Sequence, residues 1–328
     1  MTKVSITDIR EAAKTALMAH GADDWIAEVV ADATADSESL GNKVCGLYYL
    51  ESYCQQLVSG RVKGAVEPAV TRPRPGSVAV DAKFGFAQAG FARGLPEAVK
   101  ATRENGIAYL AVGQAHTCTS LGYFTHQIAM EGLIGLGMTN ASACVAPPGG
   151  NAPVLGTNPI AFSVPKDGGG VGLHYDFSTS VVAKGKITMA QAAGQPIPEG
   201  WAVDSGGNPT KDPAAALAGA QLSAGGYKGW GIGLMVELLA AGMTASVNSL
   251  DVPALKSPAG DPHNLGQFYI LIDPQSDQSD FYARFARVAD AVGEQPGGRL
   301  PGLTLNRADA VDVPDALWKL VQTLQTRA

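Results

Sequence analysis

The apolar positions of the first sixty residues recur every three or four residues, a spacing typical of helices with one buried face. We expect three helices there. The first begins at a Ser5 or Thr7 cap, the second begins at an Asp23 cap, and the third covers about 47–60. The proline-rich stretch 68–75 then breaks the pattern and is a candidate domain boundary.

Short apolar runs alternate with helical stretches in the middle of the chain, as in α/β proteins. A helical stretch over about 86–103 leads into the apolar run 107–112, and one over about 121–131 leads into 134–139. Further strands are expected at 160–164, 172–177 and 268–272. The end of the chain, from residue 278, predicts two amphipathic helices. The pattern therefore indicates an α/β fold.

These elements divide into a helical domain formed from both termini and an α/β domain between them. We assign residues 1–72 and about 255–328 to the first and about 73–254 to the second. With 46% hydrophobic and 16% charged residues, the 328-residue chain is too apolar to be disordered. Its net charge is −6 and it has no basic run, so nucleic acid is not an expected partner.

Targeting and cysteine usage point to a cytoplasmic protein. Residues 1–21 carry scattered charges and lack the continuous apolar region of a secretory signal. The apolar stretch 230–247 contains Glu237 and three glycines, which favours a buried helix over a membrane span. The four cysteines, Cys45, Cys54, Cys118 and Cys144, are far apart and lack metal-ligand spacing. We expect reduced thiols and no metal site.

Several common enzyme motifs are missing from the sequence. A dinucleotide-binding GxGxxG between a strand and a helix is absent, because the glycines at 132, 135 and 137 and at 229, 231 and 233 have the wrong spacing. A Walker A loop, HExxH and GxSxG are also absent. The sequence therefore lacks the motifs of these enzyme classes, and their absence does not indicate to which class the protein belongs.

Polar residues gather instead in glycine-rich segments that follow the apolar runs. The segment 114–120 opens a helix with hydroxyl groups and can bind an anion, although Thr119 or Ser120 could equally cap that helix. The turns between 147 and 159 can be purely structural. Lys228 lies at a helix start, where its charge opposes the helix dipole, so it hints at a bound anion.

Seven segments, taken in order along the chain, carry a resemblance to a known family. They are GTNPIAF at 156–162, DFSTSVVAKGKI at 176–187, PEGW at 198–201, NPTKDPAAAL at 208–217, YKGWGIGLMVELLAAGMT at 227–244, GQFYILIDP at 266–274 and LPG at 300–302. With them, nearly the whole chain resembles the malate/L-lactate dehydrogenase family of NAD(P)-dependent oxidoreductases. That family also includes ureidoglycolate, sulfolactate and diketogulonate dehydrogenases and reductases of pyrroline- and piperideine-2-carboxylate.

The resemblance implies a non-Rossmann α/β fold in which a largely antiparallel mixed sheet with flanking helices lies beside a helical domain. It also implies a homodimer acting on a small molecule with NAD or NADP, and NADPH is favoured if the chain is an imine reductase. The implied cofactor contacts are His116, Thr117, Cys118, Thr119, Ser120, His174, Tyr175, Asp176, Lys228, Gly229 and Arg299. Thr157 is implied beside the substrate, and we add Tyr49 and Lys184 as candidate substrate-binding residues.

The catalytic residues of the family are replaced in this chain. The family's Ser-His-Gly, in which the His is the proposed proton donor, is Val44-Cys45-Gly46 in this sequence. The Arg that binds the substrate carboxylate is replaced by Tyr49, and the acidic relay residue of the imine reductases is replaced by Lys186. Thr117 and Cys118 also depart from the family's usual Asn-His-Phe-Gly segment.

Our candidate catalytic residues are therefore Cys45, His116 and Lys186. As a thiol with an ordinary pKa of about 8.5, Cys45 could donate a proton, or it could simply pack in the core. Gly46 leaves room for close approach of a ligand. A protonated imine substrate would relax the need for a donor, because it already carries the proton that a ketone must receive.

Three classes of function follow. The leading hypothesis is hydride transfer from NAD(P)H to a small 2-oxo or cyclic 2-imino acid. The alternative is a degenerate relative that binds a nucleotide or metabolite without turnover, as the altered catalytic residues suggest. A purely structural protein is not favoured, because it would have no use for the preserved polar loops.

Overall fold

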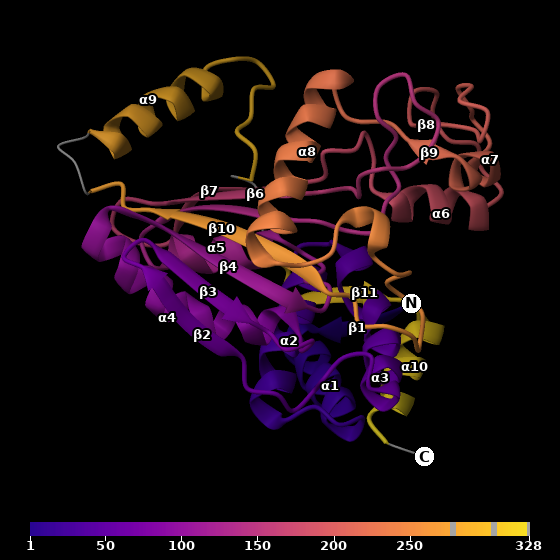
Figure 1. Ribbon diagram of the computed structural model, residues 1–328, viewed down its shortest axis with the longest axis horizontal. Coiled ribbons are helices and arrows are strands. Elements are labelled where there is room, and N and C mark those ends of the chain that lie inside the picture. The colour runs from indigo at the N-terminus through magenta and orange to yellow at the C-terminus, as the bar shows by residue number, and fades with distance from the viewer. Residues whose placement is uncertain (276–279, 303–306, 327–328) are drawn as a thin grey trace.

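The computed structural model describes residues 1–275, 280–302 and 307–326, and it has a central sheet with helices packed on both faces (Figure 1). Its helices are α1 (Ile6–Ala19), α2 (Asp24–Ser39), α3 (Leu50–Ser59), α4 (Ala87–Asn105), α5 (Gly122–Met130), α6 (Lys184–Ala192), α7 (Pro213–Ala218), α8 (Tyr227–Ala240), α9 (Phe281–Gly293) and α10 (Asp315–Leu324). Its strands are β1 (Thr2–Ser5), β2 (Ala69–Arg74), β3 (Ser77–Asp81), β4 (Ile107–Ala115), β5 (Ile134–Thr139), β6 (Ile160–Pro165), β7 (Val171–Phe177), β8 (Ala202–Val203), β9 (Ala220–Gln221), β10 (Leu265–Ile272) and β11 (Ala310–Val313).

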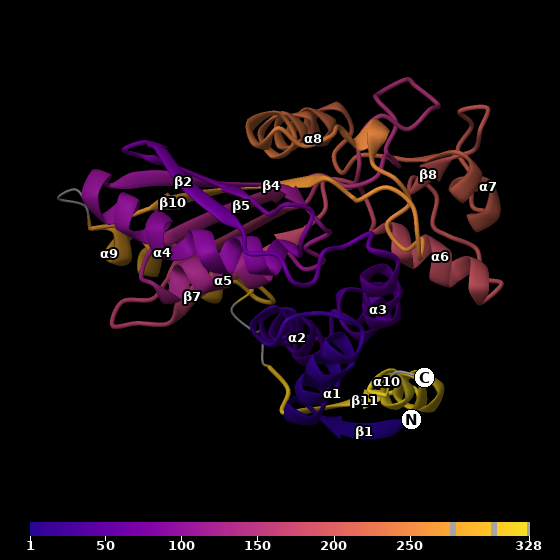
Figure 2. The same ribbon diagram turned by 60° about the horizontal axis from the view of Figure 1, so that its bottom comes forward.

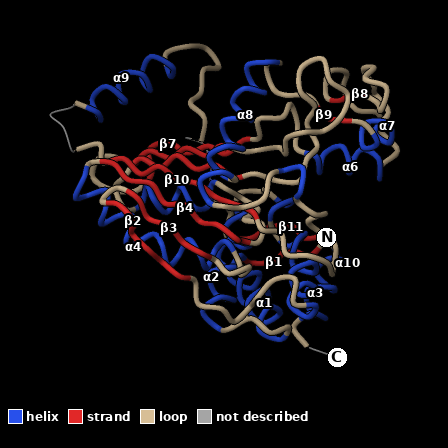
Figure 3. Tube along the Cα trace, in the orientation of Figure 1, coloured by secondary structure: helices blue, strands red, loops and turns tan. Residues whose placement is uncertain are grey.

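The central sheet has seven strands in the order β2-β3-β4-β10-β5-β6-β7, which lie side by side in Figure 3. Within it the pair β3–β4 is parallel and is joined by α4, because a parallel pair needs a crossover connection. The other neighbouring pairs are antiparallel. The expected α/β fold with a largely antiparallel mixed sheet is therefore confirmed.

Helices α4 and α5 cover one face of this sheet, and α8 lies on the other (Figure 2). On the first face the rings of Phe91, Phe124 and Tyr269 pack edge to face or tilted, with centroids 4.9 to 5.8 Å apart. On the second face Val236 of α8 packs with Phe268 and Met138 of the sheet. Burial on both faces explains why the strands appear in the sequence as nearly continuous apolar runs.

The helical part brings the two ends of the chain together. Helices α1 to α3 and α10 share one core, and strand β1 pairs with β11 so that Thr2 lies opposite Val313. Ser5 caps α1 as expected, because its hydroxyl accepts the Asp8 N–H at 3.0 Å. Asp23 occupies the N-cap position of α2, as expected, although its side chain makes no capping hydrogen bond.

The packing of β10, α9 and β2 bears on the expected division into two domains. Strand β10 lies in the centre of the sheet, although the helical domain was expected to begin at about residue 255. Helix α9 lies beside β7, where an added Cβ on Gly172 would be 3.4 Å from the Phe285 ring. The proline-rich stretch 68–75 forms the edge strand β2, since an edge strand tolerates proline. We therefore propose that the helical unit is closed by the segment from residue 308 onward.

A small lobe extends from one end of the sheet. It consists of α6, α7, β8 and β9, and its core contains Ile187, Ile197 and Ala202 (Figure 1). The sequence pattern predicted none of these short elements. In the part of the chain that the structure describes, no helix is both long enough and apolar enough to cross a membrane.

Candidate active site

The turn that carries Cys45 lies between α2 and α3 and consists of two short 3-10 helices, Lys43–Cys45 and Leu47–Tyr49. The buried carboxylate of Glu38 holds this turn, because its Oε1 accepts the Leu47 N–H at 2.8 Å. An added Cβ on Gly46 would lie 2.3 Å from the same Oε1. The space beside Gly46 is thus filled by Glu38, and the expectation that it admits a ligand is wrong.

His116 follows β4 and is almost fully buried, with 2% of its surface exposed. Its Nε2 lies 2.7 Å from Gln56 Oε1, and its ring stacks on His263 with centroids 3.9 Å apart. The Nδ1 of His263 accepts the Thr117 N–H at 3.2 Å. Burial lowers the pKa of His116 well below its usual value and lowers that of His263 to about 3, so both rings are neutral at pH 7.

The segment after His116 leads into α5, where Thr119 or Ser120 was expected as a cap. Thr119 instead has a positive φ of 59° and donates to the Cys118 carbonyl at 2.6 Å. The cap comes from β7, because Asp176 Oδ2 accepts the Gly122 N–H at 2.8 Å. The carboxylate thus lies at the helix start, where the dipole favours a negative charge.

Strand β7 turns His174 and Asp176 to one side and Tyr175 to the other, because strand side chains alternate. His174 Nδ1 lies 2.7 Å from Ser163 Oγ, and burial lowers the pKa of His174 to about 4. Tyr175 stacks on Phe177 with centroids 5.3 Å apart. The strand end therefore presents a neutral imidazole and a carboxyl group to the start of α5.

The segment that contains Arg299 also reaches this strand. Gly302 has a φ of 77°, and an added Cβ there would lie 1.5 Å from the His174 carbonyl oxygen, so the position requires glycine. Arg299 itself is exposed. Beside Gly302 lies a polar hollow of about 140 Å³, which His126, His174 and Arg307 line together with residues of β7.

Electrostatic influence on ionisation links Cys45, Tyr49, Cys118 and Asp176, which come from segments distant in the sequence. Burial first and then the Asp176 carboxylate raise the pKa of Cys45 to about 12. The same two causes raise the pKa of Cys118. Burial and Cys45 raise the pKa of Tyr49. Both thiols and the phenol are therefore uncharged at neutral pH.

Asp176 differs from these groups in its exposure. Its side chain is exposed to solvent, although nearby protein atoms also desolvate it. Burial raises the pKa of Asp176 to about 6, against the hydrogen bonds from the start of α5. We refer to Cys45, Tyr49, Cys118 and Asp176 together as the Cys45–Asp176 cluster.

Lys184 and Lys186 lie in the first turn of α6, beside the Cys45 turn. An added Cβ on Gly185 would be 3.2 Å from Val44 Cγ1, which places this helix start against the residue before Cys45. Both lysine side chains are exposed. The candidate cations therefore lie beside the turn that carries Cys45.

The turn containing Thr157 is held by backbone contacts rather than by its hydroxyl. The Thr157 carbonyl accepts the Thr179 N–H at 2.9 Å and the Thr179 hydroxyl at 3.1 Å. The next residue, Asn158, has a φ of 37° and donates to Glu237 Oε2 on α8 at 2.8 Å. The Thr157 side chain is half-buried.

Lys228 is exposed in the first turn of α8. This helix start is tied to the segment after β7, because Ala224 N–H donates to the Thr179 carbonyl at 2.9 Å. Gly229 packs on the same loop, since an added Cβ there would lie 1.7 Å from the Ala224 carbonyl oxygen. These contacts join Lys228 to the segment after Asp176 and do not bring it to the 116–120 loop.

Sequence reasoning missed Glu38, Gln56 and His263. Glu38 lies on the buried face of α2, in line with Ile26 and Val30. An acidic residue on a buried helix face indicates that its carboxylate accepts hydrogen bonds from the protein. Gln56 and His263 gave no such signal, since their partners are distant in sequence. In residues 1–275, 280–302 and 307–326, no three His, Cys, Asp or Glu side chains are arranged to hold a metal ion.

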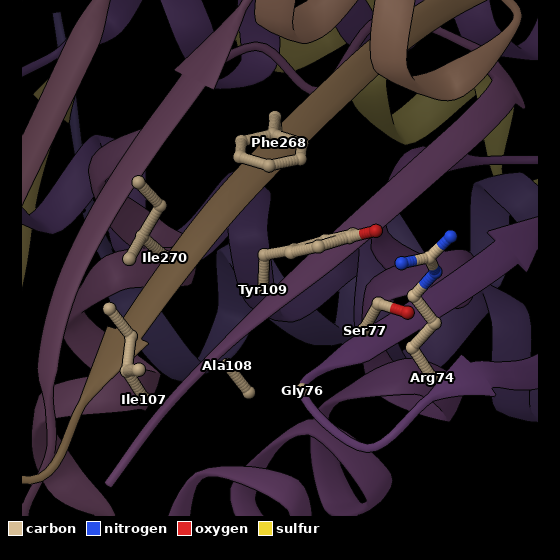
Figure 4. A pocket seen from close by; sticks show the side chains of 8 residues that line it. All are labelled: Arg74, Gly76, Ser77, Ile107, Ala108, Tyr109, Phe268 and Ile270. Carbon is tan, nitrogen blue, oxygen red and sulfur yellow. The ribbon is translucent and has the colours of Figure 1, made fainter. Parts of the chain in front are cut away.

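A separate hollow of about 400 Å³ lies on the sheet face opposite α4 and α5 (Figure 4). It is lined by Arg74, Gly76, Ser77, Ile107, Ala108, Tyr109, Phe268 and Ile270. None of the residues predicted for the site belongs to this set, so this hollow is distinct from the Cys45–Asp176 cluster.

Comparison with known proteins identifies the family of this chain. The family model for malate/L-lactate dehydrogenase matches residues 4–308. The (2R)-3-sulfolactate dehydrogenase (NADP(+)) of Chromohalobacter salexigens is 38% identical over 320 residues, which are 96% of this chain and 95% of that protein. The Δ1-pyrroline-2-carboxylate reductase of Ancylobacter novellus is 35% identical, over 99% and 98% of the two chains.

A solved structure agrees with these matches. The crystal structure of Δ1-piperideine-2-carboxylate reductase from Pseudomonas syringae superposes with a TM-score of 0.90 at 33% identity, over 99% of this chain and 100% of that one. The chain belongs to the malate/L-lactate dehydrogenase family, whose members are NAD(P)-dependent 2-hydroxyacid dehydrogenases and imino-acid reductases. The expected oxidoreductase class is confirmed.

Proposed function

We propose that this chain reduces a small 2-oxo acid or a cyclic 2-imino acid with NAD(P)H at the Cys45–Asp176 cluster. The observation that carries the proposal is that segments distant in sequence converge there. Cys45 and Tyr49 come from the helical part, Cys118 follows β4, and Asp176 ends β7. Such a convergence of titratable groups is typical of an active site.

The residues present fit a dinucleotide. The cofactor would supply the hydride, and the N-terminal end of α5 with Thr117, Cys118, Thr119 and Ser120 would face it, as would His174, Tyr175 and Asp176. The polar hollow beside Gly302 contains the Arg307 guanidinium, whose Nε pairs with Asp36 Oδ1 at 2.8 Å. An Arg in a polar hollow is suited to a phosphate group. We therefore propose NADP over NAD, with Arg299 and Arg307 near the adenosine phosphate.

On the substrate side we propose that a lysine replaces the arginine lost at Tyr49. Lys184 and Lys186 flank Gly185, which packs on Val44 next to Cys45. A flexible ammonium group at this position can pair with the substrate carboxylate as a point charge, without the two-pronged geometry of arginine. Neutral Tyr49, together with Thr157, would provide hydroxyl groups for the rest of the substrate.

We propose that the chain works as a cytoplasmic homodimer. Helix α8 packs on the sheet through Val236, but its other face exposes Tyr227, Ile232, Leu234, Met235 and Leu238. A row of large apolar side chains on one helix is typical of a surface that another chain covers. All four cysteines are free thiols, which suits a reducing compartment.

A second candidate is a binding protein without turnover. Two observations favour it. The Cys45 thiol, with a pKa of about 12, holds its proton too tightly to be an effective donor. The His116 ring is almost fully buried and so is closed to a substrate. Initial rates over a panel of 2-oxo and cyclic 2-imino acids, each with NADH and NADPH, test the two functions. Turnover supports the reductase. Cofactor binding without turnover of any panel compound supports the binding protein.

A further inference from the structure

We propose that the hollow on the α8 side of the sheet, lined by Arg74, Ser77 and Tyr109, binds a small carboxylate with an aromatic body. This hollow has a volume of about 400 Å³, within the range of small-molecule sites. It would be a ligand site additional to the Cys45–Asp176 cluster, and it would bind its ligand whether or not the chain is a reductase.

The strand register places polar and apolar side chains side by side in this hollow. Arg74 of β2 lies opposite Ser77 of β3, and Ser77 pairs with Tyr109 of β4. Tyr109 in turn pairs with Ile270 of β10. Because neighbouring strands lie about 4.8 Å apart, the four residues form one row across four strands. Figure 4 shows the guanidinium and the two hydroxyl groups at one end of the hollow, with Ile107 and Ile270 at the other.

Arg74 brings a positive charge that has no acidic partner. Arg72, two residues earlier, pairs with Glu97 at 3.2 Å and Glu104 at 2.6 Å on α4, which covers the other face of the sheet. The register of β2 and β3 shifts between Thr71 and Arg74, and such a bulge re-aims the side chains around it. Arg74 therefore lines the hollow instead, and it forms no ion pair with any residue that the structure describes.

The Ser77 hydroxyl is a second, independent observation that indicates a ligand. Only 2% of this residue is exposed, and its Oγ has no hydrogen-bond partner in the part of the chain that the structure describes. A buried hydroxyl without a partner costs free energy, which an acceptor atom of a ligand recovers. Since Ser77 lies between Arg74 and Tyr109, a carboxylate held by the guanidinium can also accept from the hydroxyl groups.

The remaining lining of the hollow favours an aromatic body for the ligand. The rings of Tyr109 and Phe268 stack with centroids 5.1 Å apart and planes 28° apart, so they form an aromatic wall. Ile107 is 53% exposed and Ile270 is half-buried, so both present apolar surface that a ligand can cover. A simple inorganic anion would leave this surface in water, whereas an aryl carboxylate covers it.

A second copy of the chain fits the hollow less well. The exposed face of α8 offers apolar side chains but no carboxylate, because Glu237, its acidic residue, is buried. Docking of that face on the hollow would leave the Arg74 charge covered and unpaired, which is costly. A small aryl carboxylate satisfies the polar and the apolar end together.

Titration calorimetry with 1-naphthylacetate, in the absence of cofactor and substrate, tests the site. We expect the wild type to bind it with a Kd of about 1 mM or lower. The uncharged 1-naphthylacetamide should bind about 10-fold more weakly, because it lacks the charge-assisted contacts. Acetate, which has the charge without the rings, should not bind at the same concentration.

Three variants locate the binding. Arg74→Gln should weaken 1-naphthylacetate binding by about 10-fold or more, since it removes the positive charge. Ser77→Ala should weaken it by a few fold while urea unfolding shows no loss of stability, because the hydroxyl has no partner to lose. Arg287→Gln is the matched control on α9, at an exposed residue outside the hollow, and should bind like the wild type.

Three results would overturn the proposal. The first is an unchanged Kd in Arg74→Gln, and the second is displacement of the ligand by NADPH or pyruvate, which would place it at the Cys45–Asp176 cluster. The third is a wild type that does not bind at about 1 mM ligand, including the case in which only the Leu238→Lys variant binds because a second chain covers the hollow. Failure of the reductase function is separate, since a chain that turns over no substrate can still bind 1-naphthylacetate.

Discussion

Asp176 Oδ2 accepts the Gly122 N–H at 2.8 Å, so strand β7 supplies the cap of helix α5. The same bond places a carboxyl group at the helix start, and nothing larger than glycine fits there. An added Cβ on Gly122 would lie 2.9 Å from His174 and 3.1 Å from Asp176. One hydrogen bond thus joins the end of β7 to the start of α5.

Removing the Glu38 carboxylate should destabilise the Cys45 turn. In Glu38→Ala the buried Leu47 N–H loses its acceptor, at a cost of about 1–3 kcal/mol in the free energy of unfolding. Glu38→Gln keeps an acceptor oxygen and should recover most of this loss. Urea unfolding of the two variants and the wild type measures the difference. Equal stabilities for Ala and Gln would show that the hydrogen bond does not hold the turn.

Cys45 should behave as an unreactive thiol that is dispensable for proton transfer. With its pKa raised to about 12, little thiolate is present at pH 8, so alkylation by iodoacetamide should be much slower than that of a free cysteine. Cys45→Ser should retain turnover within a few fold. Mass spectrometry of the labelled peptide and initial rates check the two statements. A loss near 10²-fold in Cys45→Ser would return the donor role to the thiol.

The buried histidines should make the fold sensitive to acid. Folding depresses the pKa values of His116, His174 and His263, those of the last two to about 4 and about 3. Their stabilising contribution is complete above the unfolded value of about 6.5 and is lost as the pH falls from there toward the folded values. Urea unfolding at pH 7.5, 6 and 5 should show decreasing stability, with a smaller decrease in His263→Gln. Constant stability over this range would be inconsistent with neutral buried rings.

The exposed face of α8 should hold two chains together. Leu238, 62% exposed, lies on that face, and Leu238→Lys should shift the mass measured by light scattering from two chains toward one. Met189 of α6 is 63% exposed on another surface, so Met189→Lys is the matched control and should stay dimeric. If the wild type has the mass of one chain at micromolar concentration, the proposal of a homodimer is wrong.

The sequence alone determined the α/β class, most element positions and the family. Hydrophobic spacing is a local property, so the strand Ile134–Thr139 and the start of α1 at a Ser5 cap could be predicted directly. The preserved motifs, which are also local, indicated the oxidoreductase class through their resemblance to the family. The resemblance also implied that Val44 and Cys45 stand where the family has its catalytic Ser-His pair.

Only the tertiary structure decided what these residues can do. His116 and Cys45 are ordinary candidates in the sequence, but burial against Gln56 and His263 seals the first, and desolvation raises the pKa of the second. Desolvation depends on the atoms that distant segments bring together, and no local pattern encodes it. Burial likewise raises the pKa of Asp176, a residue of β7, although groups at the start of α5 donate hydrogen bonds to its carboxylate.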